Sequence, residues 1–220
     1  MSLRRVFSSS VGTKLVIGAT GLLLFAYLLL HLAGNLMVFG GQDTFNHYAH
    51  MLASNPLVVP AEIALLLLFL IHIYKAVMMW TKNQAARPVR YEEKAWAGYT
   101  SRKSLASTTM IWTGLAILVF VIVHVAHIKY GAWYQIGDPP VRDLYRTEVD
   151  VFSSPLWVTV YVIAMALIGF HLRHGISSAF QSLGVDHPVY TKRLVAAGTI
   201  VAILIAGGFA VIPMWVYLTR

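Results

Sequence analysis

The sequence contains no cysteine and few charged residues. Without cysteine the chain has no disulfide, no thiolate nucleophile, no cysteine-bound zinc and no iron–sulfur cluster of its own. Only 12% of its 220 residues are charged, whereas a soluble domain usually carries about 25%. These two shortages leave the nine histidines as the main ligands for any metal chemistry.

Hydrophobic residues make up 58% of the sequence, and the mean hydropathy is +0.67. Five apolar runs are long enough to cross a bilayer, at about 20 residues each. They cover residues 15–39, 57–80, 108–130, 155–180 and 194–218. No polar block between them is long enough to fold separately. The first run is too long for a signal peptide and lacks a small-residue cleavage site. The sequence therefore predicts an all-α integral membrane protein, with residues 1–220 as one domain of five transmembrane helices.

The net charge of +8 follows the predicted membrane topology and does not indicate a nucleic-acid partner. Lysine and arginine gather at the N-terminus and in the connections after the second and fourth runs, whereas the connection 40–56 has none. Because basic residues stay on the cytoplasmic side, we expect a multi-pass protein of the cell inner membrane. Its N-terminus is expected to be cytoplasmic and its C-terminus outside.

Histidines inside the membrane are the most informative polar residues, since ionisable groups are costly there. Six lie on the predicted spans: His31, His72, His124, His127, His171 and His174. With a rise of about 1.5 Å per residue, His31 and His124 lie roughly 6 and 10 Å outside the midplane. By the same rise, His72 and His171 lie roughly 5 and 8 Å inside it.

These four histidines form two layers, and each layer can supply both axial ligands of one haem. We expect the first four helices to form the haem-binding bundle. His31 and His124 would bind the iron of an outer haem b, and His72 and His171 that of an inner haem b. Such haems have no open coordination position and carry single electrons.

Other side chains near these layers are further candidates: His127, His174, Lys75 and Arg173. The two histidines share helix faces with the proposed ligands but lie nearer the membrane surfaces. They are therefore candidates for bonds to haem propionates, a quinone or backbone carbonyls. The two cations either pair with inner propionates or extend to the interface.

A polar cluster near the outer end of the second helix is a candidate quinone site. It contains Glu62, Asp43, Asn46, His47 and His50. A quinone site needs hydrogen-bond donors and a proton relay beside a redox centre. The alternative for the connection 40–56 is a solvated loop.

Two other functions remain compatible with these residues. One is a free-standing transmembrane di-haem cytochrome b that passes electrons from a soluble donor to an outer acceptor. The other is a haem-free channel or structural anchor, in which histidines form hydrogen bonds between helices.

Short motifs follow one another along most of the chain. They are Ser10-Val11-Gly12-Thr13-Lys14, Thr20-Gly21, His31-Leu32-Ala33-Gly34-Asn35-Leu36, Phe45-Asn46-His47-Tyr48-Ala49, Ala61-Glu62, Ile71-His72-Ile73, Ala86-Arg87-Pro88-Val89-Arg90-Tyr91, Thr113-Gly114 with His124, and His171 with Gly175. In this order and spacing they resemble the di-haem cytochrome b subunit of succinate:quinone oxidoreductases, which also serves fumarate reductases. The resemblance is to the single-subunit, five-helix anchor type.

This resemblance implies a role within a larger enzyme. The positions of His124 and His171 in these motifs match the family's axial histidines, which favours His124 over His127 and His171 over His174. In the family, helices two and four hold the inner haem and helices one and three the outer one. A flavoprotein subunit oxidises succinate, and an iron–sulfur subunit passes the electrons to the anchor, which itself oxidises no succinate. The anchor transfers them to a quinone, usually menaquinone, within the membrane lipid.

Overall fold

Long apolar helices form five candidate membrane spans in the computed structural model, which describes residues 9–86, 105–185, 187 and 189–220. The spans are Ser10–Ala53, Val58–Ala85, Met110–Lys129, Pro155–Ser182 and Thr191–Thr219. The predicted all-α fold with five spans is therefore confirmed. Part of the charge pattern and the end of the motif at 86–91 fall in 1–8 and 87–104, outside the described residues.

The first span contains three consecutive helices. Helix α2 (Ser10–Asn35) begins five residues before the predicted run, because the Ser9 side chain caps it by accepting a hydrogen bond from the Gly12 N–H at 3.0 Å. A 3₁₀ turn, η1 (Leu36–Gly40), follows, and Gly41 has a φ of +84°. Helix α3 (Gly41–Ala53) then occupies the segment expected as a connecting loop. The loop expectation was wrong, because this segment has a buried face that includes Phe45.

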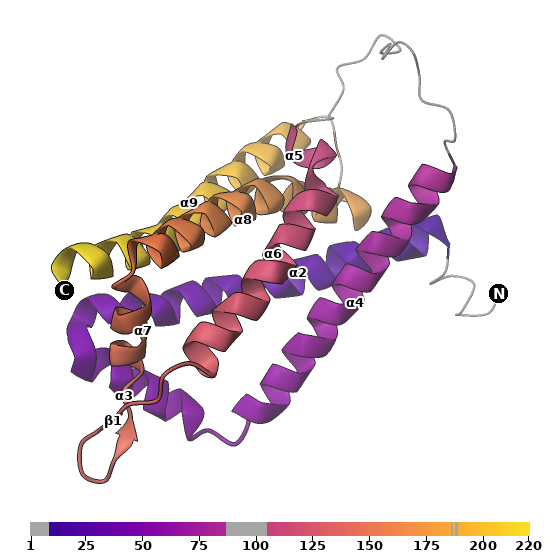
Figure 1. The fold of residues 1–220 in the computed structure, drawn as a ribbon. Coiled ribbons are helices and arrows are strands. Elements are labelled where there is room, and N and C mark those ends of the chain that lie inside the picture. Colours follow the sequence, from indigo (N-terminus) through magenta and orange to yellow (C-terminus); the bar gives the residue numbers. More distant parts are fainter. Residues whose placement is uncertain (1–8, 87–104, 186, 188) are drawn as a thin grey trace.

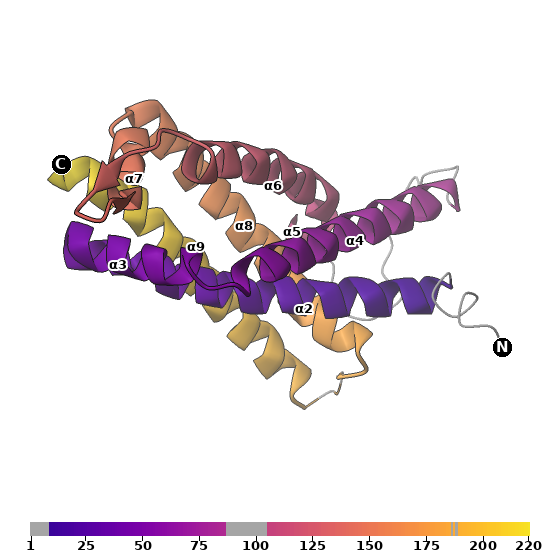
Figure 2. The same ribbon diagram turned by 90° about the horizontal axis from the view of Figure 1, so that it is seen from below.

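The four spans that carry histidines contact one another in a closed cycle. Helix α4 (Val58–Ala85) packs on α2 and on α6 (Met110–His124), which continues as the π-helical turn η2 (Val125–Lys129) after the short α5 (Leu105–Thr108). Helix α8 (Pro155–Ser182) closes the cycle between α6 and α2. Helix α9 (Thr191–Thr219) lies against α8 and α2 (Figures 1 and 2). This arrangement provides the four-helix bundle that the histidine layers require.

Helices α8 and α9 form the best-packed part of the molecule. Ile168 and Leu172 of α8 are buried against Ala202 and Ile205 of α9. A Cβ added at Gly169 would lie only 3.0 Å from the Ala206 Cβ, so the two backbones approach closely, as small residues allow in membranes. Helix α4, by contrast, has no buried residue and lies at the periphery of the bundle (Figure 2).

A polar cap covers one end of the bundle, which we call the capped end. It consists of α3, an antiparallel hairpin of β1 (Gln135–Ile136) and β2 (Val141–Arg142), and α7 (Leu144–Phe152) (Figure 1). The opposite end, where α2 begins, is the N-terminal end.

One buried carboxylate connects the parts of the cap. Asp143 accepts hydrogen bonds from Gln42 Nε2 at 2.7 Å, Asn46 Nδ2 at 2.8 Å and the Arg146 N–H at 3.0 Å. The Asn46 side-chain oxygen accepts from the Tyr145 N–H at 2.9 Å. The side-chain amide of Asn46 therefore joins α3 to α7 through both its nitrogen and its oxygen.

We predict that Asn46→Ala destabilises the protein. The change removes one of the three hydrogen bonds to the buried Asp143 carboxylate and takes away the acceptor of the Tyr145 N–H, at a cost of about 1–3 kcal/mol. The thermal midpoint in detergent, followed by helical circular dichroism, should fall by about 2–4 °C per kcal/mol. The exposed His47 on the same helix provides the control, since His47→Ala should change stability by less than about 0.5 kcal/mol. Equal midpoints for Asn46→Ala and the unmodified chain would contradict this role.

Candidate functional site

Two histidines from different helices meet near the capped end. The ring centres of His31 on α2 and His124 on α6 are 5.9 Å apart, and the ring planes are inclined by 82°. Two metal–imidazole bonds of about 2 Å each, together with the ring radii, hold two ring centres about 6 Å apart. The spacing of this pair, called the His31 pair, therefore suits one metal atom bound between the rings.

Aromatic side chains surround the His31 pair. Tyr27 stacks on His31 with ring centres 5.4 Å apart, and Phe209 of α9 lies 5.6 Å from the same ring. Phe120 stacks on His124 at 5.7 Å. Among the described residues, the buried Nδ1 of His124 has no hydrogen-bond partner. The pair thus lies in an apolar environment with unused coordination capacity.

The second pair, called the His72 pair, consists of His72 on α4 and His171 on α8, which lie within electrostatic reach of each other. Each ring contacts a threonine on a neighbouring helix. His72 Nδ1 lies 3.0 Å from Thr20 Oγ1 on α2, and His171 Nδ1 lies 3.2 Å from Thr113 Oγ1 on α6. The structure therefore brings together the same two pairs that the depth estimate groups.

The further candidates have varied surroundings. His127 lies on the π-helical turn, where its ring stacks on Tyr161 at 6.3 Å and meets Trp157 edge-on at 4.2 Å. His174 lies within electrostatic reach of His171. Lys75 is half-buried and Arg173 is exposed. His127 thus faces the aromatic residues of α8, whereas His124 faces His31.

The five candidate quinone residues divide into two groups. Four of them come from α3 and line one cavity of about 300 Å³. Its lining consists of Asp43, Asn46, His47, His50, Ile136, Gly137 and Val141. The Asn46 amide is already bonded to Asp143 and Tyr145, so Asp43, His47 and His50 are the polar side chains with remaining hydrogen-bonding capacity.

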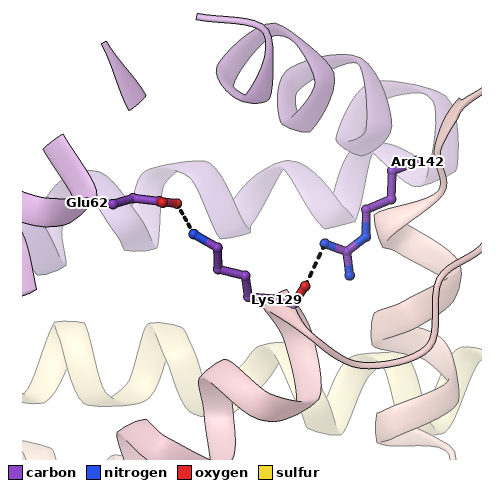
Figure 3. Close-up of polar contacts among 3 residues, drawn as sticks. All are labelled: Glu62, Lys129 and Arg142. Atoms are coloured by element: carbon purple, nitrogen blue, oxygen red, sulfur yellow. Dashed lines mark hydrogen bonds and ion pairs between the residues drawn. The ribbon is translucent and has the colours of Figure 1, made fainter. Parts of the chain in front are cut away.

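Glu62 is not among the residues that line this cavity. It forms an ion pair with Lys129 of η2 (Figure 3) and lies within electrostatic reach of Tyr27, which stacks on His31. Arg142 of the hairpin donates a hydrogen bond to the Lys129 carbonyl at 3.2 Å (Figure 3). The start of α4, the end of the third span and the hairpin therefore meet at Glu62 and Lys129.

Sequence reasoning assigned no site role to five residues found here: Thr20, Thr113, Tyr161, Lys129 and Glu148. A detectable signal existed for the threonines, because a Thr-Gly dipeptide occurs in both the first and the third span. Nothing in the sequence marks Tyr161 or Glu148, since their positions depend on how α7 packs on α8.

Glu148 is a buried acid at the capped end, only 3% exposed. Its Oε2 has no hydrogen-bond partner among the described residues, and neither has the hydroxyl of Tyr161, which lies within electrostatic reach. Burial disfavours the charged form and raises the pKa of the Glu148 carboxyl to about 8. This side chain therefore carries a proton at neutral pH.

These features define a multi-pass helical membrane protein that holds two histidine pairs within its spans. The chain is similar to the succinate dehydrogenase cytochrome b558 subunit of Bacillus subtilis (strain 168). The two are 26% identical over 171 residues, which cover 76% of this chain and 77% of that protein. No family model and no solved structure matches the chain. The similarity supports a cytochrome b membrane subunit of succinate dehydrogenase, and thus part of an oxidoreductase complex.

We predict that Glu148 makes the protein less stable as pH rises. Its pKa is about 8 when folded and near 4.5 in the absence of burial, so the folded state binds more protons between these values. Stability must then fall as pH increases through this window. Glu148→Gln should remove this component, giving a higher thermal midpoint than the unmodified chain at about pH 8 and a similar one at about pH 5.

A matched control for this experiment is Asp138→Asn on the exposed hairpin tip. It should leave the difference between the two midpoints unchanged. The assignment of the buried proton to Glu148 is wrong if Glu148→Gln retains the pH dependence of the unmodified chain.

Proposed function

We propose that this chain is the di-haem membrane anchor of a succinate:quinone oxidoreductase and transfers electrons from an iron–sulfur subunit to a quinone. The observation that carries the proposal is the presence of two histidine pairs on four spanning helices. The similarity to a succinate dehydrogenase cytochrome b558 subunit supports it independently.

The residues of both pairs fit haem b. The rings of His31 and His124 have the spacing for one iron atom, and all four histidines are only half-buried by the protein itself. In the His72 pair both Nδ1 atoms have partners, which leaves both Nε2 atoms for iron. When bound, two haems with all axial positions filled supply single-electron transfer.

The capped end contains the groups that a quinone site requires. Glu62, Lys129 and Tyr27 provide a carboxylate, an ammonium and a hydroxyl beside the His31 pair. Asp43 and His47 line the cavity beneath the hairpin and suit proton supply from the aqueous side. We propose that a quinone binds at the capped end, between these groups. The family resemblance favours menaquinone.

The partners and orientation follow from the same proposal. The N-terminal end, with the N-terminal arginines, faces the cytoplasm and contacts the iron–sulfur subunit, which receives electrons from a flavoprotein that oxidises succinate. The capped end faces the outer side of the inner membrane. Electrons moving outward would then meet protons taken up from the outside. Each elementary charge moved through 100 mV changes the energy by about 2.3 kcal/mol, so this arrangement couples the reaction to the membrane potential.

We predict that the chain purifies from its native membrane with a flavin-containing and an iron–sulfur subunit. The reduced-minus-oxidised spectrum should contain the alpha band of haem b, with two haems per chain. Purification alone but with two haems would favour a free-standing di-haem cytochrome b. A spectrum without an alpha band would refute both haem-binding functions.

We further predict that His72→Ala and His171→Ala each remove the same one of the two haems. His31→Ala and His124→Ala should each remove the other, because each haem needs both of its ligands. Haem content and redox titration of the purified complexes measure this. His187→Ala, an exposed histidine outside the spans, should retain both haems. Loss of different haems from the His72 and His171 variants would rule out the proposed pairing.

A further inference from the structure

The His72 pair has a repeated threonine arrangement that the His31 pair lacks. Thr20 on α2 contacts the ring of His72 on α4, and Thr113 on α6 contacts the ring of His171 on α8. Both threonines are buried, with exposed fractions of 8% and 7%. Helix α2 thus carries His31 and contacts His72, and helix α6 carries His124 and contacts His171.

The hydrogen bonds of these threonines determine which atom donates to which. A hydroxyl has one proton to donate. Thr20 donates it to backbone carbonyls, Val16 O at 2.7 Å and Ile17 O at 3.2 Å. Its oxygen must therefore accept the hydrogen bond from His72 Nδ1–H. The Ile17 carbonyl also lies within hydrogen-bonding reach of His72, and a carbonyl can only accept.

The same reasoning holds for the second contact. When Thr113 donates its proton to the Thr109 carbonyl at 3.2 Å or the Met110 carbonyl at 3.1 Å, its oxygen accepts from His171 Nδ1–H at 3.2 Å. With the threonine protons on the carbonyls, both histidines carry their proton on Nδ1 and the lone pair on Nε2. That is the tautomer that binds a metal through Nε2.

A glycine follows each threonine and brings the helix backbone close to the ring. A Cβ added at Gly21 would lie 3.3 Å from His72 Cε1, and one at Gly114 would lie 3.4 Å from His171 Cε1. An added methyl group would press on the ring at Gly21 and reach van der Waals contact with it at Gly114. The Thr-Gly dipeptide therefore orients the ring through both a hydrogen bond and a close contact.

The His31 pair provides the internal comparison. The ring nitrogen Nδ1 of His31 faces the amide nitrogen of Asn35 at 3.3 Å, and this amide also donates to the His31 carbonyl at 2.8 Å. Nδ1 of His124 has no partner among the described residues. In the described part of the chain, neither ring therefore has a side-chain oxygen that holds a proton on Nδ1.

We propose that Thr20 and Thr113 are positioning residues that hold His72 and His171 in the iron-binding tautomer and orientation. This inference rests on the proposed function and adds residues to its site. A hydrogen bond from Nδ1–H makes an imidazole a more basic ligand, which favours ferric over ferrous iron. The two threonines therefore increase retention of the haem at the His72 pair and lower its midpoint potential.

The test uses the purified complex with Thr113→Val or Thr20→Val, because valine has the shape of threonine without its oxygen. Redox titration should show one haem with a more positive midpoint potential, the same haem in both variants, and the other haem unchanged. That haem should also be lost about tenfold faster to an excess of apo-acceptor protein, at the lower end of the effect of such outer contacts. Thr113→Val should have the larger effect, because the Ile17 carbonyl remains as an acceptor for His72.

Serine variants and a third threonine are the controls. Thr113→Ser and Thr20→Ser retain the hydroxyl and should restore the original potential. Thr199→Val on α9 removes a hydroxyl that bonds only to the Val195 carbonyl, at 2.9 Å, and should change neither haem. If a valine chain does not accumulate, Gly21→Ala should displace the His72 ring slightly, because the added Cβ would lie 3.3 Å from His72 Cε1, and should shift the same haem.

The possible failures are distinguishable. An unmodified complex without haem overturns the proposed function and this inference with it. Two haems in the unmodified complex, with potentials and retention unaffected by both valine changes, overturn this inference alone. It is also overturned if the two valine variants shift different haems or if the serine variants resemble the valine ones.

Discussion

A bilayer offers no water to a polar side chain, so each polar group within a span must find its partner in the protein. This constraint organises the histidines of the bundle. His72 and His171 meet it by donating to threonine oxygens on neighbouring helices, and the threonines meet it by donating to carbonyls of the preceding helical turn. Within the described part of the chain, Nδ1 of His124 and Nδ1 of His127 lack a hydrogen-bond partner, and both rings lie toward the capped end, where we propose the outer haem and the quinone.

The cap extends the same principle to the membrane surface. Arg142 stacks its guanidinium on Trp133, 4.5 Å from the ring centre, and its donors bond the carbonyls that end the third span. Asp143 beside it connects α3 to α7. Arg142 and Asp143 thus close the end of the third span and connect the elements of the cap.

The two ends of the bundle differ in how they hold their histidines. Aromatic rings surround the His31 pair, whereas threonine oxygens and glycines position the His72 pair. Helix α4 carries a ligand of the second pair but has no buried residue. Its polar attachments therefore matter more than its packing: the Glu62–Lys129 ion pair at the capped end and the His72–Thr20 contact within the span.

The sequence by itself determined the number of spans, because hydrophobic length is a local property. It also predicted the grouping of four histidines into two layers, because residue position along a helix sets depth. It predicted a loop where α3 forms, since the helix depends on burying Phe45 and Asn46 against α7. It grouped Glu62 with the α3 residues, whereas the start of α4 turns Glu62 toward Lys129. Which side chains meet across helices, such as Thr20 with His72, was decided only by the tertiary structure, because helix rotation and packing set those distances.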